Sequence, residues 1–351
     1  MNKNTKIIWG LIIIIALIVI VTTVRRNSET PSGPLKIGVI APSSGPYAIM
    51  NEGIQHAIYL ASSTHLTAVY QDDQCDTKDA ISAYNLLKQQ NVKLFYVACS
   101  GSVMALSPLA KQNGDLIITA YAGSAAIRET GSEVIRFIPD ALSVTEVMNK
   151  YIKSQTGKKF VLLYENQDYA KSAADAIATS SGSSIIDTES YSSSDNSYLT
   201  ILTKIKAAKA DFIVWIPTSD VAAQKILKEM KTLGVTTPII GDVNLCGYPF
   251  SPKDFGIHGV CWNAELSSDG FEQFKSAFKS TFGVDSQYPF YDAITYDSIG
   301  IIDSLIPQVG TDIVLLKEKL LAGVSGKVSS YNFDPNGEVQ DAGKYLAKVD
   351  F

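Results

Sequence analysis

The chain has 351 residues, a formal net charge of −5, 46% hydrophobic residues and 19% charged residues. This length suits two domains of about 100–200 residues each, and the composition is typical of a globular protein rather than a disordered one. The weakly acidic balance excludes the basic surface that a nucleic-acid-binding protein presents, so we expect no nucleic-acid partner.

The first residues combine two lysines, an uncharged apolar run over residues 7–24, and two arginines. The run is long enough to span a bilayer and longer than the apolar core of a signal peptide, which has roughly 7–15 residues. The residues at its C-terminal end, 21–26, contain neither a small-residue cleavage site nor a cysteine that could carry a lipid. We therefore predict an uncleaved membrane anchor over residues 1–26, with a cleaved signal peptide as the alternative. A polar linker follows over residues 27–34.

Short apolar runs then alternate with helical patterns. We expect strands over 35–40, 66–71, 93–97 and 116–119, and helices over 51–61, 79–89 and 103–112. This alternation predicts βαβ units and a parallel sheet.

A second series begins near Ala141, with strands over 160–164, 185–191, 212–216 and 238–241 and helices over 170–178 and 222–233. Helical patterns over 270–282, 293–305 and 312–321 follow, and then short strands around 331–333 and 345–349 on either side of a turn at 334–337. The chain is thus an α/β protein with two doubly wound parallel sheets.

The motifs of common enzymes are missing from the sequence. It contains no G-x-S-x-G elbow, no phosphate-binding G-x-x-x-x-G-K-[ST] loop, no H-E-x-x-H and no G-x-G-x-x-G. The three histidines are scattered and leave few candidates for general-base chemistry. The sequence contains no C-x-x-C pair, which is a common spacing of metal-binding cysteines. We predict neither an enzyme, nor a cofactor, nor a bound metal.

The loops beyond the second and third strands carry the polar residues that a ligand would meet. Cys75 lies in the first loop, and Cys99, Ser100 and Ser102 lie in the second, where a helix begins. In an open α/β sheet, ligands bind beyond the carboxyl ends of strands, where helix N-termini offer free N–H groups. Ser100 or Ser102 either binds a ligand there or only caps the helix.

These loops resemble those of the type I periplasmic binding proteins of ABC importers, typified by the branched-chain amino-acid-binding proteins. The likeness runs from about residue 36 to the C-terminus and includes Tyr291-Asp292-Ala293 at a helix start. It implies two lobes joined by three chain crossings, near 139–140, 264–265 and 331–332. Carried over, residues 35–139 and 266–330 form lobe 1, and residues 140–265 and 331–351 form lobe 2.

In lobe 1 the resemblance implies that Ser100 binds a ligand carboxylate, with Ser102 as a further candidate. The next strand ends in Tyr121-Ala122-Gly123-Ser124, where relatives have an alanine-threonine pair. Ala122 through its backbone, or Ser124 after a one-residue shift, then completes the carboxylate site. Tyr121 either fills the cleft or stacks on the ligand.

In lobe 2 the resemblance implies that Tyr169 covers the ligand. Thr218 lies in a loop where some relatives place a tyrosine that this chain lacks. Branched-chain amino-acid binders have a glutamate at Val243 or one residue earlier, and Asp242 is the matching acid for a ligand ammonium. Helix capping is the alternative role for Asp242.

The four cysteines fall as two pairs, Cys75 with Cys99 and Cys246 with Cys261. They form either disulfides or buried free thiols, and disulfides would place the body outside the cytoplasm. The resemblance implies a Cys75–Cys99 bridge, because cysteines at matching positions are bridged in relatives. The pair Cys246 and Cys261 is a second candidate bridge.

The resulting hypothesis is a single-pass, membrane-tethered binding protein with its folded body outside the cytoplasm. It would capture an amino acid or related small polar molecule between its lobes and deliver it to an ABC permease. The alternative is a receptor ectodomain of the same fold that senses a ligand without transport.

Overall fold

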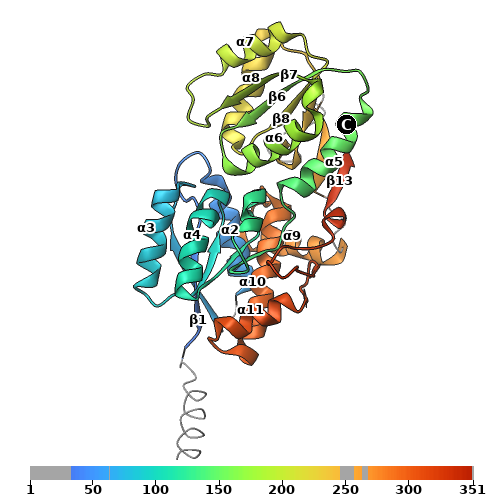
Figure 1. Ribbon diagram of the computed structural model, residues 1–351. Helices are drawn as coiled ribbons and strands as arrows, with labels where there is room; N and C mark the ends of the chain where they lie inside the picture. Colours follow the sequence, from blue (N-terminus) through green and yellow to red (C-terminus); the bar gives the residue numbers. More distant parts are fainter. Residues whose placement is uncertain (1–32, 63, 246–256, 263–267, 350–351) are drawn as a thin grey trace, which may run out of the picture.

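Two α/β lobes stacked end to end make up the computed structural model, which describes residues 33–62, 64–245, 257–262 and 268–349 (Figure 1). The predicted anchor over residues 1–26 lies outside the described residues and stays a prediction. In the described part of the chain, no helix combines the length and apolar character needed to cross a bilayer.

The first lobe is built on a five-stranded parallel sheet in the order β2-β1-β3-β4-β5. Its strands are β1 (Leu35–Ile40), β2 (Leu66–Gln71), β3 (Leu94–Val97), β4 (Leu116–Thr119) and β5 (Val134–Arg136). The central strands β3 and β4 are buried along their whole length, as expected for a parallel sheet with helices on both faces.

Six helices cover this sheet, three from the N-terminal half and three from the C-terminal part (Figure 1). They are α2 (Ile49–Ala61), α3 (Thr77–Lys88), α4 (Ser100–Asn113), α9 (Ser268–Phe282), α10 (Pro289–Val309) and α11 (Ile313–Leu321). Segments far apart in the sequence therefore share one core, in which side chains of β1, α2 and α10 pack together.

The second lobe is built on a six-stranded sheet in the order β13-β10-β9-β8-β6-β7, in which only β13 is antiparallel to its neighbour. Its strands are β6 (Phe160–Glu165), β7 (Ile185–Tyr191), β8 (Phe212–Ile216), β9 (Ile239–Gly241), β10 (Ile257–Trp262) and β13 (Leu346–Val349). Its helices are α5 (Ala141–Ser154), α6 (Asp168–Ser181), α7 (Leu199–Ala208) and α8 (Asp220–Leu233). The predicted pair of doubly wound parallel sheets is confirmed, and β5, α5, α7 and β10 are among the additions to the predicted elements.

The chain enters the second lobe between Ile138, which belongs to the first core, and Ala141, which belongs to the second. Asp140 lies at this point and caps α5, because its carboxylate accepts the N–H of Ser143 at 3.0 Å. The second predicted crossing, at 264–265, lies outside the described residues.

The final return to the second lobe lies later than the predicted crossing at 331–332. Tyr331 and Tyr345 still pack in the first core, and Leu346 is the first residue of this segment in the second. A short hairpin of β11 (Val324–Ser325) and β12 (Ser330–Tyr331) precedes it, and a bridge between Arg136 and Glu338 then holds the segment beside β5. This pairing along the sheet edge is a long-range contact that the local sequence pattern does not reveal.

Candidate functional site

A cavity of about 420 Å³ lies between the lobes. Its walls come from the loops beyond the five strands of the first lobe, from the loops beyond β6, β8 and β9 of the second, and from α9 and the start of α10. This is the edge at which open α/β sheets bind ligands. Of the predicted ligand-binding residues, four line the cavity: Ser100, Tyr121, Tyr169 and Thr218.

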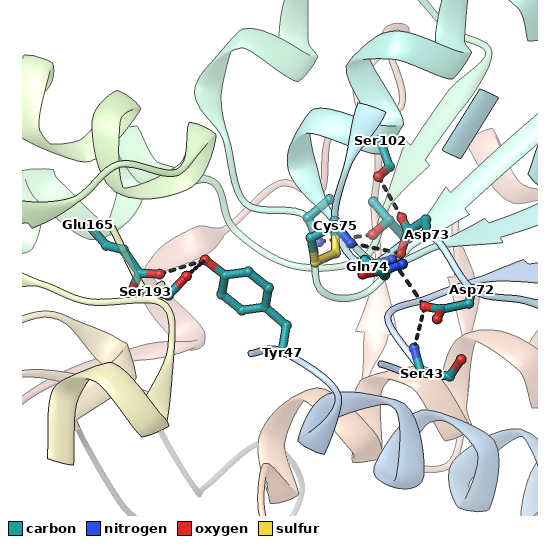
Figure 2. Close-up of a disulfide and its surroundings, with 12 residues drawn as sticks. Ser43, Tyr47, Asp72, Asp73, Gln74, Cys75, Ser102, Glu165 and Ser193 are labelled. Atoms are coloured by element: carbon teal, nitrogen blue, oxygen red, sulfur yellow. Dashed lines mark hydrogen bonds between the residues drawn. A yellow bond between two sulfur atoms is a disulfide. The ribbon is translucent and has the colours of Figure 1, made fainter. Parts of the chain in front are cut away.

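The Cys75–Cys99 disulfide forms part of the first lobe's wall, which confirms that predicted bridge (Figure 2). The loop before Cys75 turns sharply, and Gln74 and Cys75 have φ values of 48° and 58°. Buried Asp73 fixes this turn by accepting the N–H of Cys75 at 3.1 Å and the hydroxyl of Ser102 at 2.6 Å (Figure 2). Ser102 is therefore not among the residues that line the cavity, and it supports the loop instead.

The second predicted bridge is not tested in the same way. Cys261 is buried in β10, at 8% exposure, but Cys246 lies outside the described residues. Their pairing stays a prediction.

Ser100 is the first residue of α4, and its Oγ accepts the N–H of Ser124 at 3.1 Å. The preceding residue, Cys99, makes no side-chain cap, so the first N–H groups of α4 are left for another acceptor. Across the cleft, Asp168 brings a carboxylate oxygen to 2.4 Å from the position that a Cβ would take on Gly101. A carboxylate of the second lobe therefore already lies beside this helix N-terminus.

Tyr121 lines the cavity and stacks on Tyr291, with ring centroids 4.7 Å apart. Its hydroxyl donates to Asp292 at 2.6 Å. Ala122 and Ser124 are buried and do not appear among the lining residues. Their carbonyls instead accept hydrogen bonds from the Arg136 guanidinium, at 3.3 Å and 2.6 Å, so both residues anchor the loop behind the wall.

Tyr169 reaches across from the second lobe and lies directly on Gly123. A Cβ on Gly123 would lie 2.7 Å from Cδ2 of the Tyr169 ring. The ring thus occupies the space that any side chain at position 123 would need. The Tyr169 hydroxyl donates to Asp242 at 3.0 Å.

Asp242 lies behind the wall rather than on it. It is fully buried and accepts hydrogen bonds from the backbone and side-chain nitrogens of Asn244 at 3.1 Å and 3.2 Å. The neighbouring Val243 and Asn244 line the cavity in its place. The Asp242 carboxylate, which the sequence analysis assigns to a ligand ammonium, is therefore separated from the cavity by other side chains.

Several hydrogen bonds join the lobes around the cavity. Tyr47, in the loop after β1, donates to Glu165 at 2.6 Å and lies 3.0 Å from the Ser193 hydroxyl (Figure 2). On the α10 side, Tyr288 donates to Asp220, and Tyr291 donates to Asn244 at 3.2 Å. The structure is thus a closed arrangement of the two lobes.

On the wall, Gln287 Oε1 is buried and has no hydrogen-bond partner among the described residues. Thr218 Oγ1 and Trp262 Nε1 are also buried without a hydrogen bond of good geometry, although Thr218 lies beside the Tyr47 hydroxyl and Trp262 beside the Tyr291 hydroxyl. Buried polar groups in proteins are nearly always hydrogen-bonded, so Gln287 Oε1 and the poorly paired Thr218 and Trp262 on one cavity point to a ligand that would pair with them. Only Thr218 was among the predicted residues.

The N-terminus of α10 supplies site residues that the sequence analysis does not predict, namely Gln287, Tyr288, Phe290 and Tyr291. Aromatic side chains packed this densely at a helix start are the one local signal for them. Their place on the cleft depends on the return of the chain to the first lobe, which no local pattern shows.

Burial raises the pKa of three carboxyls around the cavity. The pKa of Asp220 is raised to about 6, and those of Asp242 and Asp292 to about 7, in each case mainly by desolvation. Hydrogen bonds from Tyr288, from Asn244 and Tyr169, and from Ser286 and Tyr121, respectively, oppose these shifts.

These shifts predict a pH-dependent stability. A carboxyl whose folded-state pKa of about 7 lies above its ordinary 3.8 stabilises the fold at low pH, and this contribution is lost as the pH rises through 7. We expect Asp292→Asn to raise the melting temperature relative to the unaltered protein by about 4 °C more at pH 8 than at pH 5. Thermal melts at the two pH values measure this, with the exposed Asp285→Asn as control. Equal differences at both pH values would contradict the prediction.

Comparison with known proteins identifies the family. The periplasmic binding protein family model matches residues 34–345. The Leu/Ile/Val/Thr-binding protein of Salmonella typhimurium is 23% identical over 59% of this chain, and the match spans 61% of that protein's own length. The Leu/Ile/Val-binding protein homolog 7 of Brucella abortus is 22% identical over 92% of this chain and 90% of its own.

Solved structures share the fold. The branched-chain amino acid transporter substrate-binding protein of Streptococcus pneumoniae, in complex with isoleucine, has a TM-score of 0.74 and 21% identity and covers 91% of this chain and 100% of its own. A solute-binding protein of an ABC transporter from R. palustris, in complex with benzoate, has a TM-score of 0.76 and 17% identity and covers 88% of this chain and 91% of its own. The fold is that of binding proteins, and the relatives named above are binding proteins rather than enzymes. This chain belongs to the periplasmic binding protein family.

Proposed function

We propose that the protein is the extracytoplasmic solute-binding component of an ABC transporter, tethered by residues 1–26. It captures an amino acid or related small polar molecule in the inter-lobe cavity and delivers it to a permease. The observation that carries this proposal is the closed cavity whose wall holds buried polar atoms without a well-formed hydrogen bond, among them Gln287 Oε1. A ligand that contacts both lobes would bind the closed state better and shift the population toward it.

Within this proposal the predicted site residues divide into two groups. Ser100, Tyr121, Tyr169 and Thr218 contact the ligand. Ser102, Ala122, Ser124 and Asp242 hold the wall behind them, through Asp73, Arg136 and Tyr169.

A thermal-shift screen of the full-length, oxidised protein against amino acids, amides, amines and organic acids tests the proposal. A ligand at a hundred times its dissociation constant is expected to stabilise the fold by about 2.7 kcal/mol. Thr218→Val removes a wall hydroxyl that lacks a hydrogen bond of good geometry while keeping the side-chain shape, and we expect it to weaken the response about fivefold or more.

The matched control is Thr203→Val, an exposed helix position whose hydroxyl bonds only to the carbonyl of Leu199. An unaltered melting temperature with every solute class would count against a solute-binding role. A response that Thr218→Val leaves unchanged would instead show that the ligand lies elsewhere.

A further inference from the structure

Two neighbouring residues of the second lobe, Asp168 and Tyr169, lie against two glycines of the first lobe. A carboxylate oxygen of Asp168 lies 2.4 Å from the position of a Cβ added to Gly101, and Cδ2 of Tyr169 lies 2.7 Å from that of a Cβ added to Gly123. All four residues line the cavity. The two lobes therefore meet most closely at the end of the cavity that the first lobe's loops form.

Gly101 is the second residue of α4, whose N-terminus is the place where the first lobe would attract an anion. Cys99 makes no side-chain cap, so the first N–H groups of the helix are left for another acceptor. Free N–H groups and the helix dipole together favour a negative group at such a point. A carboxylate carried by a ligand in this cavity would be drawn to it.

Asp168 already fills this place. Its side chain is exposed, and the carboxylate of an exposed aspartate is negatively charged at neutral pH. Asp168 is also the first residue of α6, so the N-termini of α4 and α6 both favour its charge. A ligand carboxylate beside Gly101 would overlap the Asp168 carboxylate in space and meet a like charge. The second lobe thus supplies the negative group that a ligand could otherwise bring.

Tyr169 covers the neighbouring loop in the same way. Gly123 lies beyond β4, and the Tyr169 ring takes the space in front of it. The two covered loops are joined, because the Oγ of Ser100 accepts the N–H of Ser124 at 3.1 Å. Asp168 and Tyr169 therefore close one continuous part of the first lobe's wall to a charged ligand group.

The rest of the described wall offers a ligand carboxylate no unpaired cation. Lys275 is the one basic side chain among the described residues that line the cavity. Its Nζ pairs with Glu272 at 2.6 Å and lies 5.0 Å from the centroid of the Phe271 ring. A ligand carboxylate would have to displace Glu272 to reach it.

The α10 side of the cavity suits an uncharged polar molecule instead. Gln287 Oε1 is buried without a partner among the described residues, and an amide oxygen accepts an N–H or O–H. The same wall carries the stacked rings of Trp262 and Phe290, whose centroids lie 4.2 Å apart. Aromatic walls of this kind bury the apolar part of a ligand.

From these contacts we infer that Asp168 determines the specificity of the cavity by occupying the N-terminus of α4. The ligand is then a small molecule without a carboxylate, with an apolar part and an amide or hydroxyl donor for Gln287. This inference rests on the proposed solute-binding function and narrows its ligand class. Ser100, predicted to bind a ligand carboxylate, would meet an uncharged group of the ligand.

Acids and the amides made from them test the inference by calorimetry on the full-length, oxidised protein. 4-Methylpentanamide is compared with 4-methylpentanoate, and benzamide is compared with benzoate, because the members of each pair share their shape and differ in charge. We expect the amide to bind about tenfold tighter than its acid in at least one pair, and neither acid to bind tighter than its amide.

Asp168→Ala removes the carboxylate that fills the place. We expect it to shift the ratio of amide to acid affinity about tenfold toward the acid. The matched control is Asp175→Ala, which removes the same charge from an exposed position of the same helix that does not line the cavity. An equal shift in both variants, or no shift in Asp168→Ala, would overturn the inference.

Tighter binding of either acid than of its amide by the unaltered protein would also overturn the inference, and it would leave the solute-binding function standing. Silence of all four probes would overturn the ligand class named for the cavity. The function itself fails only if the wider solute screen is silent too.

Discussion

Gly123→Val is expected to leave each lobe folded and to weaken ligand binding about a hundredfold. Gly123 belongs to the first lobe, and the Tyr169 ring of the second lobe lies 2.7 Å and 2.9 Å from the position of an added Cβ. Non-bonded carbons pack at about 3.5–4.0 Å, so the lobes would have to separate by roughly 1 Å at this point. Ligand contacts that need both lobes would then be lost. Calorimetry measures the affinity, and small-angle scattering measures the opening.

Gly182→Val is the matched control, because nothing lies within 4 Å of its added Cβ and its backbone is ordinary, with φ of −54°. Tyr169→Ala in the Gly123→Val background removes the obstructing ring and is expected to return the scattering profile to that of the closed protein. A Gly123→Val protein that binds as tightly as the unaltered chain would show that closure does not bring these two residues together in solution.

Gly123 is an example of a site residue whose role cannot be predicted from the sequence. The α/β alternation predicts most strands within a residue or two, because buried parallel strands are short apolar runs bounded by turns. It also directs attention to the correct loops, since Ser100, Tyr121, Tyr169 and Thr218 all line the cavity. The departure at Gly123, however, is explained only by a tyrosine from the other lobe.

The direction in which a loop side chain points is the second feature that the sequence does not predict. Ser100 and Ser102 are two residues apart at a helix start, and at 3.6 residues per turn they point to nearly opposite sides. One faces the cavity and the other faces Asp73. Asp242 and Asn244 differ in the same way at the end of β9, and neither pair can be separated without the fold.

Arg136→Met is expected to destabilise the first lobe by about 3–5 kcal/mol, because it removes one partner of a buried ion pair and leaves its carboxylate uncompensated. Arg136 is fully buried, and its Nε donates to Glu338 at 3.0 Å, while Nη2 lies 3.7 Å from Asp140. Denaturant unfolding measures the loss. Lys150→Met, which breaks an exposed pair with Glu146, is the control and is expected to cost less than about 1 kcal/mol.

Adding Glu338→Met to Arg136→Met tests whether the cost comes from the stranded charge. Replacing both partners of a buried pair by apolar residues is often nearly neutral, so the double variant is expected to recover most of the lost stability. It is not expected to recover ligand binding, because the carbonyls of Ala122 and Ser124 would still lack the guanidinium that holds their loop. Recovery of both properties would show that Arg136 only neutralises Glu338. Recovery of stability alone would show that Arg136 also positions the cavity wall beside the chain crossing at Asp140.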